Sequence, residues 1–390
     1  MKKQKEPTWL MIIRILLACV FLFSGLSKAI DPIGSGIKMD DYFQSFGMGF
    51  MHPFALWMGI LMNIAEFVLG FMLLFRIRVR LTSLGYLLFM VFFFFLTAWL
   101  AVAEHLEVNY GYNFGVVTDC GCFGQAIVMS NLETFLKNVA ILIITLIVFA
   151  KRSTIPDIRL TTLGQWLLAF VGAGIALAIQ LYCLRALPII DFSHWKKGQN
   201  VAEVFIEKPA EIDVRFLYKN ANEEEKLLAI DEIDNIVEKH PNFYTEFSYV
   251  DRIDSVISEP VPAKITGFSM LDEQGRDFAS VFLSSKNAYL LFMHDLDEVS
   301  VMALQYDNIQ KLMAHCEVND IDLAVVTNSS FDEIIAFKDK YAITFPIYHN
   351  PIDPIKGPFI VRDAIRSNPG LIILEDGIVM NKKPWRKFLK

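Results

Sequence analysis

Apolar residues gather into five long runs in the first half of the chain. Each run is close to the roughly 20 residues that a helix needs to cross a hydrocarbon core of about 30 Å. The first run follows a lysine-rich start and lacks a small-residue cleavage site, so we expect it to remain as a membrane helix. The pattern therefore predicts five transmembrane helices, over about 9–30, 53–75, 81–103, 132–150 and 161–183.

The second half has the mixed pattern of a soluble α/β protein. A small α+β region comes first, where alternation and mixed periods predict strands at 213–218 and 243–250 and a helix at 223–239. The signals then become regular, beginning with a short hairpin. The predicted order is hairpin 267–275, strand 288–293, helix 298–315, strand 321–327, helix 331–341, strand 371–374 and a last strand ending near 380.

These patterns divide the chain into four parts. They are four membrane helices over 1–152, a fifth membrane helix with a linker over 153–190, the α+β region over 191–262, and an α/β domain over 263–390. Composition agrees, because 54% of the residues are hydrophobic and 33 are phenylalanine. The formal net charge of −7, without a concentrated basic face, argues against nucleic acid as a partner and leaves membrane lipid as the expected surroundings.

Basic residues in the short connections set the expected orientation. They gather before the first span and in the second and fourth connections, and such loops stay in the cytoplasm. They are Lys2, Lys3, Lys5, Arg76, Arg78, Arg80, Lys151, Arg152 and Arg159. We therefore expect a cytoplasmic N-terminus, with everything after the fifth run on the opposite, non-cytoplasmic side, in a compartment that permits disulfides.

Two of the five cysteines, Cys120 and Cys122, flank one glycine in the loop between the third and fourth runs. Two thiols this close can close a small, strained ring, which is typical of labile, oxidising disulfides. Three interpretations stay open: redox chemistry, a soft metal that would need two further ligands, and an inert reduced pair. No Lys or Arg neighbours the pair in sequence to lower a thiol pKa, and Asp119 would raise it.

Ionisable residues inside the apolar runs are costly and often functional. Glu66 lies inside the second run and Arg14 inside the first. The first and second runs cross the membrane in opposite directions, so an Arg14–Glu66 ion pair is feasible. One alternative is a proton or quinone-binding role for these two residues. The other is that Arg14 reaches to the interface while Glu66 stays protonated; Lys28 and Lys137, near span ends, are expected to reach out likewise.

The remaining thiols and one histidine offer weaker candidates. Cys19 and Cys316 are expected to be small core residues, and Cys183 is a less favoured exchange partner for the loop pair. His294 stands beside Asp295 and Asp297, where a solvated turn is favoured over a metal site.

The membrane half resembles the DoxX and MauE membrane proteins over roughly 9–150. The resemblance rests on Arg14, Phe23–Lys28, Tyr42–Gly47, Glu66 with Gly70, and Cys120-Gly-Cys-Phe-Gly124. MauE is the methylamine-utilisation member that carries the Cys-X-Cys. The resemblance implies a four-helix bundle, here with a fifth helix, and a redox-associated role. MauE-like proteins support disulfide formation in exported proteins, and DoxD-like relatives pass electrons from a sulfur compound to quinone.

The order of elements after 263 resembles thioredoxin, with Pro369 at the place of its cis proline. The catalytic Cys-X-X-Cys of that family is absent, since the matching stretch reads His294-Asp-Leu-Asp-Glu-Val-Ser300. The resemblance therefore implies a docking role for this domain. Fusion of the two halves, with the run 366–370, resembles the larger DoxX-like proteins of Bacteroidetes-type bacteria.

The leading hypothesis is a thiol-redox protein in which Cys120 and Cys122 exchange electrons with an extracytoplasmic thiol or sulfur substrate, with quinone as acceptor. Its expected partners are an exported client or a periplasmic thioredoxin-like protein. The alternative is a membrane scaffold whose disulfide shapes the loop while the tail recruits partners. A transporter is less favoured, because the runs hold few polar groups and no inverted repeat.

Overall fold

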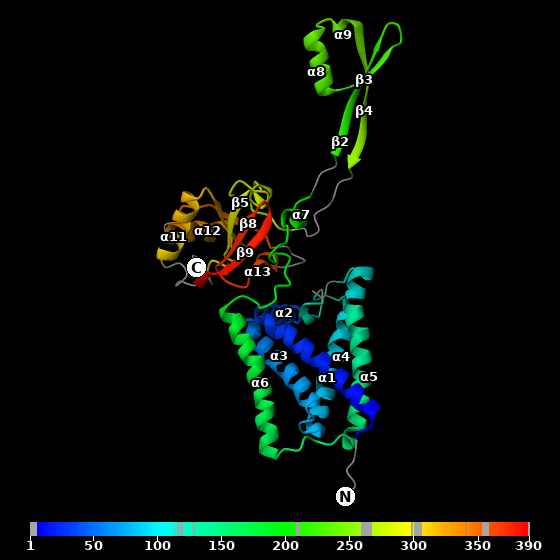
Figure 1. Ribbon diagram of the computed structural model, residues 1–390, viewed down its shortest axis with the longest axis vertical. Helices are drawn as coiled ribbons and strands as arrows, with labels where there is room; N and C mark the ends of the chain where they lie inside the picture. The colour runs from blue at the N-terminus through cyan, green and yellow to red at the C-terminus, as the bar shows by residue number, and fades with distance from the viewer. Residues whose placement is uncertain are drawn as a thin grey trace.

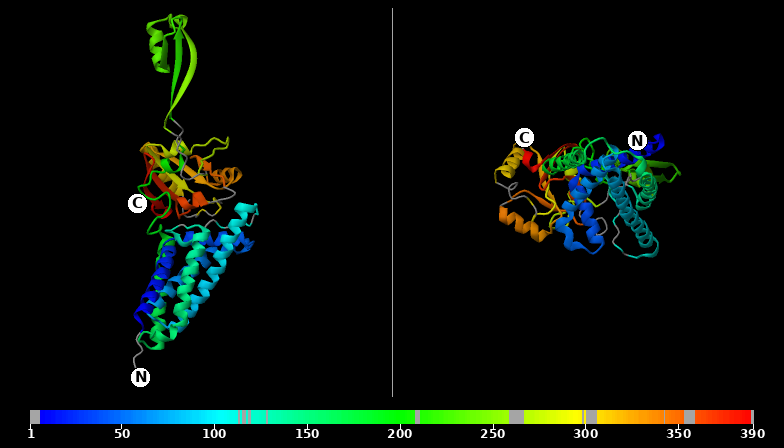
Figure 2. Two further views of the ribbon diagram at one scale, coloured as in Figure 1. Left: turned by 90° about the vertical axis from the view of Figure 1, so that its right-hand side faces the viewer. Right: turned by 90° about the horizontal axis from the view of Figure 1, so that it is seen from below.

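The computed structural model describes residues 6–112, 114, 117, 120–127, 129–207, 211–258, 267–297, 299, 306–341, 343–352 and 359–388. The chain forms three parts that follow one another along its longest axis: a helical bundle, a globular tail domain and a projecting arm (Figure 1). Helix α1 (Thr8–Ile30) begins at the end of the bundle far from the tail domain. The turned view in Figure 2 shows the same succession.

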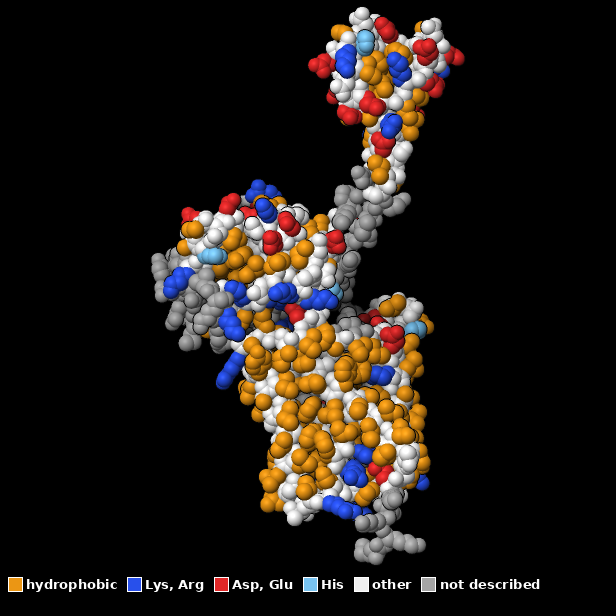
Figure 3. Space-filling model, in the orientation of Figure 1, with side chains coloured by type: hydrophobic (Ala, Val, Ile, Leu, Met, Phe, Trp, Pro, Cys, Tyr) orange, Lys and Arg blue, Asp and Glu red, His pale blue; other side chains and the backbone are white. Residues whose placement is uncertain are grey.

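The five predicted membrane helices are confirmed, and the residues that the structure describes contain five helices long and apolar enough to cross a membrane. They are α1 (Thr8–Ile30), α3 (Ala55–Leu74), α4 (Val79–Tyr110), α5 (Asn131–Ala150) and α6 (Thr162–Arg185). On the face shown in Figure 3, hydrophobic side chains cover most of the bundle, whereas most of the charged ones lie on the tail domain and the arm. Most helix ends agree with prediction, but α4 continues well beyond 103 to end before Gly111.

Helices α1 and α3 pack closely because glycine leaves room for their backbones. A Cβ on Gly25 would lie 2.7 Å from the backbone nitrogen of Phe67. Small residues of this kind allow helices to approach in a membrane, where no hydrophobic force drives them together. The loop after α4 also packs on α1.

Short elements complete the bundle. No predicted element covers α2 (Pro32–Ser45), which begins at a proline directly after its N-cap, Asp31. It runs across the tail-facing end of the bundle (Figure 1). The other short elements are η1 (Gly49–Phe54), β1 (Cys122–Gln125) and η2 (Arg152–Thr154).

The tail domain is built on a five-stranded sheet in the order β7-β6-β5-β8-β9. Strands β5, β6 and β7 are parallel, and β8 and β9 continue the sheet antiparallel. The strands are β5 (Asn287–Phe292), β6 (Asp322–Thr327), β7 (Ile347–His349), β8 (Gly370–Glu375) and β9 (Ile378–Pro384). The helices are α7 (Ala202–Phe205), α10 (Ala279–Leu283), α11 (Tyr306–Val318), α12 (Phe331–Tyr341), α13 (Phe359–Ala364) and η3 (Trp385–Lys387).

The predicted strands and helices of this region are confirmed in order and closely in position. The start of the predicted helix at 298–315 lies outside the described residues, and its described part is α11. The Asn368–Pro369 peptide bond is cis, as the position of Pro369 led us to expect. The core of the domain includes Trp195 and Val201, so the chain just after α6 contributes to it.

The arm is a three-stranded sheet, in the order β3-β2-β4, with two helices. Its elements are β2 (Glu211–Asn220), β3 (Glu225–Ala229), α8 (Ile230–Lys239), α9 (Phe243–Glu246) and β4 (Phe247–Ser258). The helix predicted at 223–239 is wrong in its first part, because Glu225–Ala229 pairs with β2 and helical amphipathicity begins only at Ile230. The strand predicted at 243–250 starts only at Phe247, because the residues before it form the single turn of α9. Within that turn the rings of Phe243 and Phe247 stack, with their centroids 5.3 Å apart.

Candidate functional site

The Cys-Gly-Cys loop (120–127) lies at the tail-facing end of the bundle, between α4 and α5, with β1 packed on α1. The hydroxyl of Ser24 donates a hydrogen bond to the Cys122 carbonyl. The hydroxyl of Tyr42, on α2, donates to the Cys120 carbonyl at 3.2 Å. Gly121 has a φ of 65°, and a Cβ there would lie 2.9 Å from Cγ of Lys38. Two helices and a left-handed glycine thus fix the loop.

The two predicted thiols lie side by side. The Sγ atoms of Cys120 and Cys122 are 3.0 Å apart, within hydrogen-bonding distance. The Cys120 side chain is buried against Phe93 and Leu100, whereas Cys122 is partly exposed. A disulfide needs the sulfurs about 2.05 Å apart, so closing the bond takes a movement of about 1 Å. The geometry suits a pair that alternates between dithiol and disulfide.

Two lysines provide the positive charge that the sequence around the pair lacks. Lys28 forms a buried ion pair of 2.6 Å with Glu66, and Lys137 lies 4.5 Å from the ring centre of Phe123. The positive charges of both lysines lower the pKa of the Cys122 thiol. The expectations that no cation lies near the thiols and that Lys28 reaches to the interface are therefore wrong, because α2 and the loop cover Lys28.

These surroundings make the two thiols unequal. The hydrogen bond from Cys120, followed by the charges of Lys137 and Lys28, lowers the pKa of Cys122 to about 6, against the opposing effects of burial and Glu66. The hydrogen bond to Cys122 and burial raise the pKa of Cys120 well above its usual value. Cys122 is therefore the thiolate and Cys120 the thiol at neutral pH. Asp119, expected to raise a thiol pKa, lies outside the described residues.

The predicted Arg14–Glu66 pair does not form. Arg14 binds Glu6 at 2.7 Å and donates to the carbonyls of Leu73 and Leu74 at 2.8 and 2.9 Å. Glu66 is instead bound by Lys28, which lies about 21 Å farther along α1 at 1.5 Å per residue. Arg14 and Glu66 therefore lie at different depths, each with its own partner, and do not fit one shared quinone site.

A buried amide network joins α6 to the site. Asn63 Nδ2 lies within hydrogen-bonding distance of Gln180 Oε1, Ser35 Oγ and Lys28 O, at 3.1, 3.0 and 3.3 Å. Gln180 Nε2 donates to Ile60 O at 3.4 Å. Sequence reasoning did not select Gln180, although a lone amide in an apolar run is the signal that could have found it.

The other sequence candidates lie apart from the cysteine pair or serve packing. Cys19 is exposed on the bundle surface, so the core position expected for it is wrong. Cys183 and Cys316 are buried, and burial raises the pKa of Cys316 to about 11. Within the described part of the chain, no three His, Cys, Asp or Glu side chains lie close enough to hold a metal ion.

His294 does not lie on the solvated turn that was favoured for it. Its Nδ1 is buried and lacks a hydrogen-bond partner among the described residues. Burial and the charges of Arg366 and Arg362 lower its pKa to about 3, so the imidazole is neutral. It belongs to the edge of the tail domain that bears Arg366.

The part of the chain that carries the cysteine pair matches a model of a known protein family. Residues 7–151 match the family model of the methylamine utilisation protein MauE. The match spans α1, α3, α4, α5 and the Cys-Gly-Cys loop. The chain is a multi-pass membrane protein. No curated protein and no solved structure gave a match. Helix α6, the tail domain and the arm lie outside the matched residues.

Proposed function

We propose that this membrane protein is a thiol–disulfide redox protein whose Cys120 and Cys122 exchange electrons with thiols of an exported protein. The observation that carries the proposal is the 3.0 Å contact between a buried thiol and a partly exposed thiol of lowered pKa. A low thiol pKa stabilises the reduced form and so makes the disulfide oxidising. A disulfide that only shaped the loop would gain nothing from this asymmetry.

The reaction is a disulfide exchange that balances without a metal. A client thiolate attacks Sγ of Cys122 in the Cys120–Cys122 disulfide, forms a mixed disulfide, and releases Cys120 as a thiolate that takes up a proton. A second client thiolate then attacks the client sulfur and releases Cys122. The client loses two electrons and forms a disulfide, while the pair gains both electrons and opens.

The surrounding residues have separate roles in this scheme. Lys28 and Lys137 stabilise the Cys122 thiolate as the leaving group, and Glu66 holds Lys28 in place. Cys120, buried beneath, is the internal thiol that closes the ring again. The electron pair must then leave the protein, and a membrane quinone is the acceptor class that we propose, with no residue assigned to bind it.

Orientation supports the same scheme. The basic connections, with Arg76 and Arg152, belong to the end of the bundle opposite the cysteine pair, which agrees with a cytoplasmic position for that end. The pair and the tail domain then face the periplasm of a bacterium with this protein in its inner membrane. We further propose that the tail domain is thioredoxin-like and holds the client or a thioredoxin-like partner above the pair.

Thiol trapping across a redox buffer series tests the proposal. The chain is studied in native membranes with Cys19, Cys183 and Cys316 replaced by alanine, so that only the pair reacts. We expect the pair to titrate near the poise of the compartment and to reoxidise faster when quinone is supplied. A pair that stays oxidised in strong reductant, or never oxidises, contradicts the proposal and favours the scaffold.

A further inference from the structure

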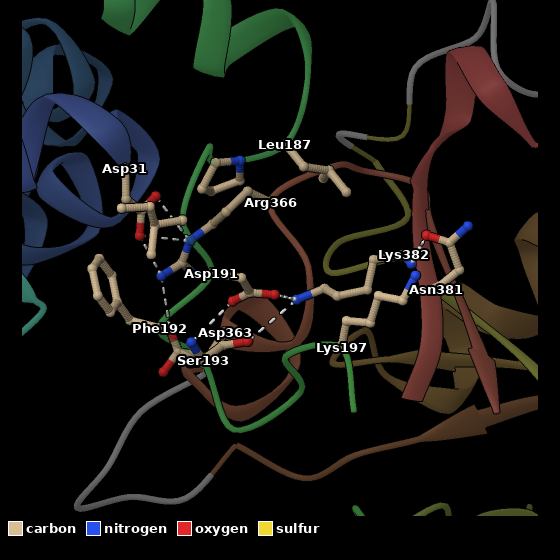
Figure 4. A pocket seen from close by; sticks show the side chains of 12 residues that line it. Asp31, Leu187, Asp191, Phe192, Ser193, Lys197, Asp363, Arg366, Asn381 and Lys382 are labelled. Carbon is tan, nitrogen blue, oxygen red and sulfur yellow. Dashed lines mark hydrogen bonds and ion pairs between the residues drawn. The ribbon is translucent and has the colours of Figure 1, made fainter. Parts of the chain in front are cut away.

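The tail domain contacts the bundle through a fully paired guanidinium. Arg366, just after α13, donates from Nε and Nη2 to the carboxylate of Asp31 at 2.9–3.1 Å. Its remaining nitrogen, Nη1, donates to the carbonyl of Arg362 at 2.6 Å, and Asp363 lies 2.9 Å from Nη2. Figure 4 shows Asp31, Asp363 and Arg366 among the residues that line a pocket here. Two-pronged pairs of this kind fix orientation as well as distance.

Asp31 closes the corner between α1 and α2. Its Oδ1 accepts a hydrogen bond from the Gly34 amide at 3.0 Å, and its carbonyl accepts from the Ser35 amide at 3.1 Å. Its own amide donates to the carbonyl of Lys28 at 3.1 Å. The carboxylate that Arg366 holds is therefore three residues from the lysine whose charge acts on Cys122.

The far end of α2 reaches the other cysteine. Tyr42 bonds the Cys120 carbonyl, and the side chain of Lys38 lies against Gly121. Because a helix moves as a rigid rod, the position of its capped end at Asp31 affects the position of both side chains. The groups that face the pair from the packed elements are Lys28 of α1, Lys38, Asp41 and Tyr42 of α2, Glu66 of α3 and Lys137 of α5.

We propose that Arg366 is a positioning residue for the cysteine pair: by holding Asp31 it fixes the α1–α2 corner, and with it Lys28 and Tyr42 against Cys122 and Cys120. Arg366 touches neither sulfur and acts through the corner. The biological role of this contact rests on the proposed function. The effect of Arg366 on the reactivity of Cys122, however, is a property of the reduced protein and can be measured separately. It gives the tail domain a direct effect on the membrane site.

The test measures the pH profile of Cys122 alkylation in the full chain lacking Cys19, Cys183 and Cys316. The variants are Arg366→Gln, Arg366→Lys, Asp31→Asn and the double variant Arg366→Gln/Asp31→Asn. Lys382→Gln is the matched control, since Lys382 lines the same pocket but forms its ion pair with Asp191, in the segment after α6, at 2.5 Å. Protease resistance of the tail domain reports whether each variant folds.

We expect Arg366→Gln and Asp31→Asn each to move the alkylation profile about one pH unit upward, which is about a ten-fold slower reaction below the midpoint. The double variant should shift no farther, because both changes break one contact. Arg366→Lys keeps a charge for Asp363 and a folded tail, but its single ammonium cannot form the two-pronged contact, so a smaller upward shift is expected.

An unchanged profile in folded Arg366→Lys and Asp31→Asn would overturn the inference, as would an equal shift in Lys382→Gln. Failure of the proposed function is seen separately. It shows in the parent chain as a pair that does not cycle in redox buffers, while the alkylation profile of the reduced thiols still tests Arg366.

Discussion

Lys28 on α1 and Glu66 on α3 form a 2.6 Å ion pair inside the bundle, directly beneath the Cys-Gly-Cys loop. Both side chains are almost fully buried. A charge in such a place is tolerated only with a partner, and each residue supplies the other with an opposite charge. The pair holds the Lys28 ammonium near Cys122, where its charge adds to that of Lys137.

Breaking this pair should destabilise the bundle. Glu66→Gln leaves the Lys28 ammonium buried without its counter-charge, and we expect a loss of about 3 kcal/mol in the free energy of unfolding. The double variant Lys28→Met/Glu66→Leu removes both charges and should recover much of this loss. Unfolding in mixed detergent micelles measures both. Normal stability and redox cycling in Glu66→Gln would contradict the prediction.

The reactivity of Cys122 should depend on pH with a midpoint near 6. A lowered pKa means that the thiolate is present above that value and is protonated below it, so alkylation should rise with pH and level off by about pH 7. Lys137→Met removes a stabilising charge and should move the midpoint upward. Mass spectrometry of alkylated protein measures the profile. A midpoint near 8.5 in the parent chain would refute the asymmetry between the thiols.

Gly121→Ala should disturb the loop more than an alanine at a glycine with open surroundings. Alanine at a φ of 65° costs about 1–2 kcal/mol, and here its Cβ also meets Lys38 at 2.9 Å. Gly47→Ala is the matched control, because Gly47 has a φ of 69° and nothing within 4 Å of a Cβ. Thermal stability and the oxidation rate of the cysteine pair should fall further in Gly121→Ala. Equal effects would show that the contact with Lys38 does not matter.

Gln180→Leu should loosen α6 from the bundle. It removes the amide that accepts from Asn63, and hydrogen bonds between membrane helices contribute about 0.6–2 kcal/mol. The double variant Asn63→Leu/Gln180→Leu should lose little more than the single one. Hydrogen exchange in α6 and detergent-induced unfolding measure the change. Strict additivity of the two substitutions would rule out a shared bond.

The sequence was sufficient to locate the spans, because bilayer thickness fixes the length of an apolar run whatever its neighbours are. The order of strands and helices in the tail domain followed from local periodicity. Local patterns failed at 225–229, where pairing with β2 overrides the propensity of the residues themselves. The thiols themselves were identifiable from their scarcity and spacing.

The partners of the buried charges could not be predicted in the same way. Arg14 and Glu66 lie on helices that do pack together, but the ends of the apolar runs did not fix the depth of each residue closely enough. The structure places the two at different depths, and Glu6 and the carbonyls at the end of α3 satisfy Arg14 instead. Lys28 stood near the end of a span and is buried because α2, α3 and the loop pack around it. Contacts that depend on two or more distant segments carry no local signal.

The tail domain can fold only after nearly all of its residues have been synthesised. The amide of Val201 donates to the carbonyl of Gly377, and Trp195 packs in the same core as Val379, so residues from both ends of this region must meet before the domain can close. The arm is looped out between them. The bundle, whose last helix ends at Arg185, is complete much earlier. A newly made chain therefore has its membrane bundle in place before the final strands emerge and bring Arg366 to Asp31.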